Sequence, residues 1–419
     1  MALQSGDRVH PPAYRSAPTP AFAGLLGCML RCHQAMNTLW TWLAVVSFTL
    51  LLGATLLLSY ADSRIVRLAE VVRRTPAERA PRVSIIAPAL NEERNLEAAV
   101  RSLTRQDYPD HEIVLVDDRS TDATQRIRAR LERQTPNLRV VTVRELPPGW
   151  LGKSHANMLG ARAATGEILL FTDADVMFAP SALDRAVAHL ERHALDHLAA
   201  SPGTVMLGLV NQFTLYFGPM FTLFVRPWRA RDPRSPAHIG IGAFNMVRAA
   251  AYRAVGGHEP IRLRPDDDLK LGKVLKRAGF RQDFVAGRGM IEVECYASWR
   301  QVCDGLMKNL HAGAEYRTWL VAVAVLGHVL LLALPPLVLL WTDGLAWWLN
   351  LGSVVLFLWQ GVAASRGFGT AWWAGLRLPP LALFGAYLLV RATWLTLRND
   401  GIDGRGTHCA LAELRANVV

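Results

Sequence analysis

A short apolar run that ends in two carboxylates is the feature that most constrains this chain. Residues 168–171 (Ile-Leu-Leu-Phe) follow the turn signal Thr165-Gly166 and precede Thr172-Asp173-Ala174-Asp175. An apolar run bounded by turn residues is typical of a buried strand. Alternate residues of an extended chain point to the same side, so Asp173 and Asp175 can face one point. Two such carboxylates suit a hard cation such as Mg²⁺, which shares substrate phosphates. The alternative is a surface turn that happens to hold two aspartates.

Strand-like and helix-like segments alternate through residues 82–200. In order, they occupy residues 83–87, 92–106, 113–116, 121–134, 140–143, 154–164 and 168–171. This order predicts an α/β domain with a mainly parallel sheet and helices on both faces. In such sheets, ligands bind beyond the carboxyl ends of the strands.

Polar residues gather where these strands are expected to end. The first strand runs into Asn91-Glu92, the second ends at Asp117-Asp118 and is followed by Ser120, and Lys153 lies before the fourth. Individually, Asn91 and Ser120 could cap helices and Lys153 could be a solvated loop charge. Four such clusters at successive strand ends, counting the two carboxylates above, favour a ligand site.

A membrane anchor is expected near the N-terminus. Residues 38–60 contain no charged side chain and are long enough to span a bilayer. A signal peptide would have a shorter apolar core and a small-residue cleavage site, so an uncleaved anchor is expected. Six arginines follow within residues 64–82 and three precede the anchor, so the positive-inside rule places the following domain in the cytoplasm. Residues 1–37 are Pro-rich and expected to be disordered, and Met36 is an alternative start to Met1.

The C-terminal third is expected to lie in the membrane. Residues 319–341 and 345–364 predict spans, and residues 379–397 form a third candidate that contains Arg391. A charge in mid-span is costly, so Arg391 either reaches the interface or belongs to a re-entrant segment. The region 319–397 therefore has two or three spans. The basic tail 398–419 would be cytoplasmic with two spans and external with three.

Residues 203–228 are almost uncharged and rich in Phe, Leu and Met. A crossing here would place the residues after it on the wrong side of the membrane from Asp175. We therefore expect an interfacial segment that lies on the membrane or lines the path of a lipid to the site. The alternative is a buried pair of core helices.

Composition narrows the classes of partner. The formal net charge is +11 and 51% of the 419 residues are hydrophobic. A basic chain can bind nucleic acid, an anionic membrane or a phosphate-bearing substrate. No Lys/Arg-rich motif with interleaved aromatic residues is present, so nucleic acid is not expected. The five cysteines lack zinc-site spacing and are odd in number, which favours free thiols.

Taken together, the motifs resemble family 2 glycosyltransferases, which have the nucleotide-sugar-binding GT-A fold. The resemblance covers residues 82–312. The matching motifs are Pro88-Ala89-x-Asn91-Glu92, Val116-Asp117-Asp118-x-Ser120-x-Asp122, Gly152-Lys153, Asp173-Ala174-Asp175, Gly242-Ala243-Phe244-Asn245-Met246 and Asp267-Asp268-x-x-Leu271-Gly272. With its anchor and C-terminal apolar segments, the chain looks most like the lipid-glycosylating branch. That branch includes ceramide glucosyltransferase and the hopanoid-associated and carotenoid glycosyltransferases.

The resemblance implies a role for each motif. Asp118 would hold the uracil ring of a UDP-sugar, and Asp173 would contact the ribose or the sugar. Asp175, with Asp173 beside it, would bind Mg²⁺ or Mn²⁺ at the diphosphate. Asp268 would be the general base, or Asp267 if the register is shifted by one. The implied substrate-binding residues are Pro88, Ala89, Asn91, Glu92, Asp118, Lys153, Asp173 and Arg300.

Glycosyl transfer also fits these residue types without the family. A metal can neutralise the charge that develops on a diphosphate leaving group. An acceptor hydroxyl must lose its proton as it attacks, which requires a nearby carboxylate. The alternative is that Asp266-Asp267-Asp268 merely favour a helix N-terminus. Processive synthases carry Gln-x-x-Arg-Trp after the base, whereas this chain reads Ser298-Trp299-Arg300-Gln301, which favours single transfer.

The sequence therefore predicts an inverting enzyme that moves a hexose from a UDP-sugar to a lipid hydroxyl at the cytoplasmic face of the membrane. One alternative is a polyprenyl-phosphate glycosyltransferase, whose acceptor is already an anion and needs no base. Another is a non-catalytic membrane protein with a vestigial nucleotide-sugar domain. The complete set of carboxylates argues against the second alternative.

Overall fold

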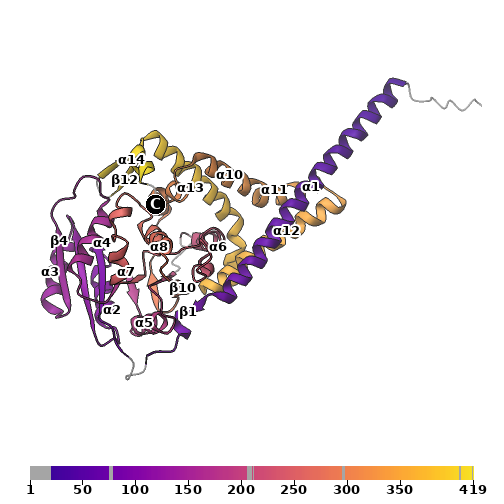
Figure 1. Cartoon of the computed structure of the whole chain (residues 1–419). Coiled ribbons are helices and arrows are strands. Elements are labelled where there is room, and N and C mark those ends of the chain that lie inside the picture. The colour runs from indigo at the N-terminus through magenta and orange to yellow at the C-terminus, as the bar shows by residue number, and fades with distance from the viewer. Residues whose placement is uncertain are drawn as a thin grey trace, which may run out of the picture.

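The computed structural model describes residues 20–419 except 75–78, 205–209, 211, 295–297, 405–406 and 418. It has two parts: an α/β domain and a set of long apolar helices that extend from one side of it (Figure 1). Within the described residues, four helical segments are long and apolar enough to cross a membrane.

The first half of the α/β domain is as the sequence predicts. Four strands pair in parallel in the order β5-β2-β3-β4. They are β2 (Val83–Ala89), β3 (His111–Asp118), β4 (Leu138–Val143) and β5 (Ile168–Phe171). The helices between them are α2 (Leu96–Thr104), α3 (Thr124–Gln134) and α4 (Gly152–Ala163). Neighbouring residues of β2 enter different apolar clusters, Ile85 in one and Ile86 in the other, so both faces of the sheet are buried.

The second half of the sheet was not expected in this form. The full order is β1-β10-β7-β9-β5-β2-β3-β4, in which β9 alone runs antiparallel to its neighbours β5 and β7. The added strands are β1 (Val66–Arg67), β7 (His197–Ser201), β9 (Asn245–Arg248) and β10 (Gln282–Ala286). Three helices complete this half: α5 (Ala182–Arg192), α7 (Ala249–Ala254) and α8 (Asp267–Arg277). A small second sheet of β6 (Val176–Phe178), β11 (Ile291–Val293) and β8 (Gly203–Thr204) begins directly after Asp175.

The apolar helices are α1 (Pro20–Arg64), α10 (Thr318–His328), α11 (Leu334–Val338), α12 (Gly344–Phe368) and α13 (Leu378–Arg398). A π-helical turn, Val329–Ala333, joins α10 to α11 just before Pro335-Pro336. Helix α1 corrects one expectation: it begins at Pro20, so residues 20–37 are helical rather than irregular. Residues 1–19 lie outside the described residues.

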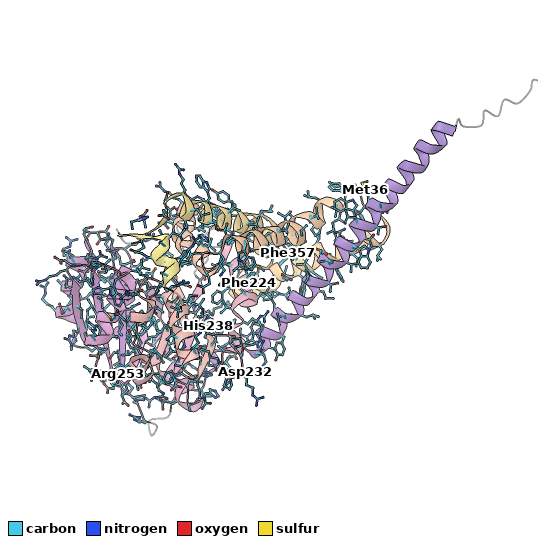
Figure 2. All side chains as sticks on the ribbon, turned by 45° about the horizontal axis from the view of Figure 1, so that its top comes forward. Met36, Phe224, Asp232, His238, Arg253 and Phe357 are labelled. Carbon is cyan, nitrogen blue, oxygen red and sulfur yellow. The ribbon has the colours of Figure 1, made fainter. Side chains whose placement is uncertain are left out.

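The segment 203–228 lies where the two parts of the molecule meet. Its helix α6 (Phe213–Val225) packs against α12 and α13, and its residues 205–209 and 211 are outside the described residues. Phe213 and Tyr216 share a buried apolar cluster with Val302 of α9 (Trp299–Gly313) and with residues of α12 and α13. Phe224 is 75% exposed at this junction (Figure 2). Helix α6 therefore packs among the apolar helices, and the interfacial position of this segment stays a prediction.

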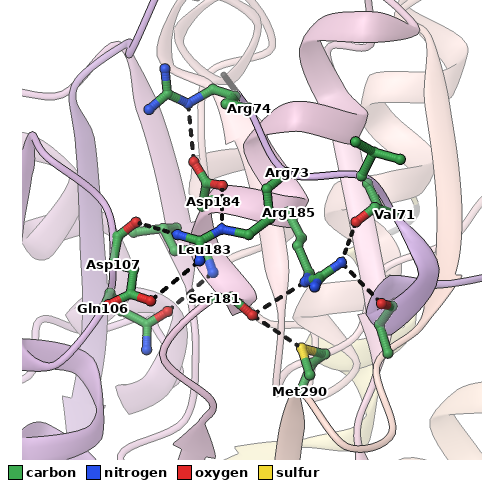
Figure 3. Close-up of polar contacts among 12 residues, drawn as sticks. Val71, Arg73, Arg74, Gln106, Asp107, Ser181, Leu183, Asp184, Arg185 and Met290 are labelled. Carbon is green, nitrogen blue, oxygen red and sulfur yellow. Dashed lines mark hydrogen bonds and ion pairs between the residues drawn. The ribbon is translucent and has the colours of Figure 1, made fainter. Parts of the chain in front are cut away.

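Ion pairs attach the anchor to the α/β domain. Arg73 and Arg74 both bind the carboxylate of Asp184 in α5, each at 3.1 Å, and the Asp184 side chain is 5% exposed (Figure 3). Arg185 donates to the backbone carbonyl of Ala69 at 2.9 Å and also to that of Val71. The chain that leaves α1 is therefore fixed along α5 rather than acting as a loose tether.

Candidate active site

The carboxyl ends of β2 and β3 form one interlocked pair of loops. The Asn91 N–H donates to Ser120 Oγ at 3.1 Å, and Asn91 Oδ1 accepts from the Thr121 N–H at 2.9 Å. The Glu92 N–H donates to Thr124 Oγ1 at 2.8 Å. Asn91 has φ 55, a conformation that Asn tolerates better than most residues. Asn91 and Glu92 thus hold these two loops together, and Pro88-Ala89 form the buried end of β2.

The two aspartates at the end of β3 have different environments. Asp117 is buried, accepts from the Ser120 N–H at 3.1 Å and pairs with Arg128 at 2.6 Å, so it holds the loop. Asp118 is also buried, and its carboxylate pairs with Arg119 Nε at 2.8 Å. Arg119 has φ 62, and its buried Nη2 atom has no hydrogen-bond partner. Arg119 therefore covers Asp118 and holds an unsatisfied donor next to it.

Three charged groups converge around Gly242. Lys153 Nζ lies 2.5 Å from Asp173 Oδ1. A methyl group built on Gly242 would lie 3.1 Å from Lys153 Nζ, 3.1 Å from Asp173 Oδ2 and 3.3 Å from Asp268 Oδ2. The absence of a side chain at Gly242 thus keeps a small space open between a cation and two carboxylates. The structure brings together three of the residues that the sequence predicted.

The segment from Gly240 to Asn245 holds the start of α8, where Asp268 lies. A methyl group on Gly240 would lie 1.8 Å from the Asp268 carbonyl oxygen, so only glycine permits this close approach. Asn245 Nδ2 donates to the same carbonyl at 3.3 Å. The Leu269 N–H donates to Asp268 Oδ1 at 2.7 Å, which leaves Oδ2 directed at the space beside Gly242.

The carboxylates of this site have perturbed acidity. Burial, together with the charge of Asp267, raises the pKa of Asp268 to about 7, although Lys153 opposes the shift. Burial, and then the charge of Asp173, raises the pKa of Asp175 to about 6. Burial disfavours the charged form of Lys153, but Asp173, Asp267 and Asp268 outweigh it and raise the pKa of this lysine. The positive charge of Lys153 therefore offsets the negative charges of Asp173, Asp267 and Asp268.

Asp267 lines the same small pocket as Asp268 but contacts different side chains. It is buried, it accepts from Asn157 Nδ2 at 3.3 Å, and its Oδ2 lies 3.7 Å from His258 Nε2. The Tyr252 hydroxyl lies 2.7 Å from His258 Nδ1, and if it donates there the proton of the neutral ring is on Nε2, facing Asp267. Burial, and then Lys153, lowers the pKa of His258 to about 3, so the ring stays neutral. Asp267 is thus held by Asn157 and lies next to a neutral histidine.

The residues present fit a divalent cation. Asp173 and Asp175 are close enough for the charge of one to raise the pKa of the other, and a cation between them would relieve this repulsion. The described residues contain no group of three or more metal-ligating side chains of the His, Cys, Asp and Glu types. A metal here would therefore complete its coordination with substrate oxygens and water, as Mg²⁺ commonly does.

Arg300 is the predicted site residue that the geometry does not join to the others. Its side chain is 91% exposed in the first turn of α9 and pairs with Asp304 at 3.8 Å. The neighbouring Trp299 packs edge-on against Phe384 of α13, with ring centroids 4.8 Å apart. In the described residues, this segment therefore serves packing between helices, and the expectation of a diphosphate contact from Arg300 has no structural support.

Sequence reasoning gave no role to several residues that shape the site. Asn245 and Gly242 lie in a motif that the resemblance singled out, so a signal for them was present. Asn157 and His258 had no such signal, because each acts on Asp267 only after the chain has folded.

Comparison with known proteins agrees with this architecture. Residues 84–256 match the family model Glycosyl transferase family 2. A 4,4'-diaponeurosporenoate glycosyltransferase of Staphylococcus haemolyticus is 25% identical over 248 residues, which cover 58% of this chain and 64% of the relative. The enzyme of the same name from Staphylococcus aureus strain USA300 is 24% identical over 237 residues, or 55% of this chain and 61% of the relative. The match thus spans less than two thirds of the length of these relatives.

Among solved structures, the mannosyltransferase PcManGT from Pyrobaculum calidifontis, in complex with GDP-Man and Mn2+, is similar in fold. Its TM-score is 0.50 at 21% identity, over 85% of this chain and 98% of that chain. At this identity the likeness establishes the fold alone. Together with the family match, it shows that this chain carries a family 2 glycosyl transferase domain with the GT-A fold.

Proposed function

We propose that this chain is a membrane-anchored inverting glycosyltransferase that moves a hexose from a UDP-sugar to the hydroxyl of a membrane lipid at the cytoplasmic face. The observation that carries the proposal is the convergence of Lys153, Asp173 and Asp268 around Gly242 in a family 2 domain. This chemistry needs a cation and paired carboxylates at the leaving group. It also needs a further carboxylate across a small space, where it can take the acceptor proton.

The lipid acceptor is supported by two observations. The relatives are named as glycosyltransferases that act on a carotenoid acid. In this chain, α8 is held at the end of α9, which packs against α13: Lys270 of α8 pairs with Glu315, and Arg264, just before α8, donates to the Ala312 carbonyl at 3.3 Å. The proposed base therefore lies on an element attached to the membrane-facing layer.

Donor binding would use the edge formed by β2, β3 and β5. The Asp118 carboxylate would accept from the uracil ring, which requires Arg119 to move away from it. Asp173 would contact the ribose or the sugar, and Lys153 would offset charge on the leaving diphosphate. Asp175, with Asp173, would hold Mg²⁺ or Mn²⁺, which when bound neutralises the diphosphate.

The transfer step would be a single displacement. The acceptor oxygen forms a bond to the anomeric carbon as the bond from that carbon to UDP breaks, and UDP leaves with the electron pair. The acceptor proton passes to Asp268 Oδ2, the carboxylate oxygen that faces the space beside Gly242. Asp267 and Lys153 fix the charge balance around this oxygen.

Labelled donors test the proposal directly. Membranes containing the full chain are incubated with radiolabelled UDP-hexoses and, separately, GDP-hexoses, and the labelled lipids are identified by mass spectrometry. We expect a neutral glycolipid from a UDP-hexose, which is lost on chelation and in membranes carrying Asp268→Asn. Label in an acid-labile polyprenyl phosphate would instead support the alternative acceptor. Label from GDP-hexoses alone would contradict the donor assignment.

A further inference from the structure

Helices α1 and α12 define two opposite ends of the apolar part of the molecule. At the end far from the α/β domain, Asn37 Nδ2 of α1 donates to Asp343 Oδ1 at 3.4 Å, in the turn that precedes α12. Further along, Gln360 Nε2 of α12 donates to Thr55 Oγ1 of α1 at 2.7 Å. The two helices therefore run parallel, from the far end toward the domain, and Figure 1 shows both leading back to the domain.

The C-terminal end of α12 is fixed to the α/β domain. Arg288 Nη1, in the loop after β10, donates to the carbonyl oxygens of Gly367 at 2.9 Å and Arg366 at 3.2 Å. The chain leaves the α/β domain through α10 and α11 and turns at Asp343. Helix α12 then returns it to the domain. At this point the chain after the domain has passed through the apolar layer twice.

Both ends of α13 lie against the α/β domain and its attached helix α6. Before α13, Arg377 Nη1 donates to Gln212 Oε1 at 2.7 Å. After it, the tail elements β12 (Gly401–Gly404), β13 (Thr407–Ala410) and α14 (Leu411–Ala416) dock on the domain. Leu411 and Leu414 share a buried cluster with Leu151 and Leu263 of the domain. Asn417 Nδ2 also donates to the Pro260 carbonyl at 3.1 Å.

We infer that α13 does not cross the membrane but lies along the bilayer surface on the domain side, and that the C-terminal tail stays on that side. This inference rests on the membrane placement proposed above. By length and composition, residues 372–398 could span a bilayer, but a helix whose two ends are held by one folded domain cannot have them on opposite sides. The chain then crosses three times, through α1, through α10 with α11, and through α12.

The two faces of α13 suit this position. Its inner face, which includes Leu381, Gly385 and Ala392, is buried against the protein. Its outer face carries apolar side chains that are 43–54% exposed at spacings of four and three residues, so they form one stripe along the helix. They are Leu383, Tyr387, Val390, Trp394 and Leu397. Figure 1 shows α13 running across the directions of α1 and α12 along the flank of the domain.

The charges and aromatic residues of α13 point to lipid as the partner of this stripe. Arg391 lies about two thirds of the way along α13, two turns from its end, where a crossing would put its charge in hydrocarbon. In a surface position, its guanidinium stays at the level of the headgroups, and Trp394 and Tyr387 occupy the interface that these residues favour. The stripe is also continuous, through the exposed Trp372 and Trp373, with the surface of α12. A second copy of the chain is the competing partner.

Depth measurements on the full chain in phosphatidylcholine–phosphatidylglycerol vesicles test the inference. In a cysteine-free background, spin labels are placed at Leu383, Val390 and Leu397, and their collisions with oxygen and with an aqueous nickel chelate report depth. Fourteen residues of helix are about 21 Å long, so a crossing would put the Leu397 label near one surface and the Leu383 and Val390 labels far deeper. We expect three similar, shallow depths. Leu345 and Val355 of α12 are the matched control, and we expect a shallow and a deep label there.

Each other outcome overturns the inference in a distinct way. A deep label at Val390 would show that α13 crosses. Labels in the stripe that are shielded from both reagents would show that protein, not lipid, covers it. A Val355 label that is exposed to the aqueous reagent would contradict the membrane placement itself, and the inference with it.

Sidedness provides a second measurement. Single cysteines at Asp232 on the domain, Asp343 at the far turn and Glu413 in the tail are treated with a membrane-impermeant maleimide in intact cells. We expect labelling at Asp343→Cys, and protection of Asp232→Cys and Glu413→Cys until the membrane is permeabilised. Labelling of the tail without labelling of the domain would overturn the inference.

Discussion

At the scale of single residues, the carboxylate pair at the start of α8 separates into two roles. Asp267 is buried against Asn157 and His258, whereas Asp268 is half-buried and directs Oδ2 at the space beside Gly242. A base must reach the proton that it takes, so the geometry favours Asp268. This answers, as a proposal, the question of register that the sequence left open.

Asp268→Asn should keep the fold and remove the proton acceptor. General-base catalysis is worth about 10²–10⁴ in rate, so we expect turnover to fall by that factor while UDP affinity changes little. Turnover and UDP binding are measured on the purified chain in detergent. Asp232→Asn, an exposed carboxylate on the same domain (Figure 2), is the control and should leave both unchanged. Near-normal turnover of Asp268→Asn would favour an acceptor that is already anionic.

The raised pKa of Asp268 predicts that kcat/KM depends on pH. Its pKa is raised to about 7, so the carboxylate is protonated below neutral pH and cannot accept a proton there. We expect kcat/KM to rise with pH between pH 5.5 and 8, with a midpoint in the neutral range, because only the ionised form is active. A profile that is flat across this range would exclude Asp268 as the titrating base.

Asp175 predicts a separate pH effect on metal binding. Its pKa is raised to about 6, so protons and a divalent cation compete for the carboxylate below that pH. We expect Mn²⁺ affinity, measured by titration calorimetry in the presence of UDP, to weaken as the pH is lowered from 7 to 5. Asp175→Asn should bind Mn²⁺ weakly at every pH. Equal Mn²⁺ affinity at pH 7 and pH 5 in the unaltered chain would remove Asp175 from the metal site.

At the scale of elements, the segment from Gly240 to Asn245 joins the sheet to the proposed base. Gly242→Ala would place a methyl group 3.1 Å from both Lys153 Nζ and Asp173 Oδ2, which is tight but can be accommodated by small shifts. We expect a folded protein whose thermal midpoint changes little and whose turnover falls about tenfold to 10²-fold, because misplaced groups lose catalytic geometry.

Gly313→Ala is the matched control for that substitution. Gly313 ends α9, and a methyl group there meets no atom within 4 Å. Turnover of Gly313→Ala should equal that of the unaltered chain. If Gly242→Ala also kept full turnover, the space beside Gly242 would not be where substrate reacts.

Some strands of the sheet could be predicted from the sequence and others could not, for physical reasons. Strands β2, β3 and β5 were predictable because each is a continuous apolar run with turn residues beside it. Strand β9 was not, since Asn245–Arg248 begins and ends with polar residues and its antiparallel position depends on pairing with Leu170 and Phe171. Likewise, Asp173 and Asp268 carried motifs, while the contact of His258 with Asp267 arises only in the folded chain.

At the scale of the whole molecule, the arginines after α1, from which the sequence predicted a membrane orientation, also serve the fold. Five of the six form ion pairs with carboxylates of the described chain. They are Arg67 with Glu70, Arg73 and Arg74 with Asp184, Arg79 with Glu167, and Arg82 with Asp110. Through Arg73 and Arg74, this positive charge fixes the segment after α1 to the α/β domain.

These two roles can be separated by the double substitution Arg73→Gln/Arg74→Gln. It leaves Asp184, which is 5% exposed, without either ion-pair partner (Figure 3). Breaking a buried ion pair on one side costs about 3–5 kcal/mol, which lowers the thermal midpoint of a domain of this size by roughly 10 °C. Orientation should not change, because the remaining arginines and the docked tail stay on the domain side. Thermal unfolding and maleimide access at Asp232→Cys measure the two effects. An inverted domain with an unchanged thermal midpoint would show that these arginines act on orientation alone.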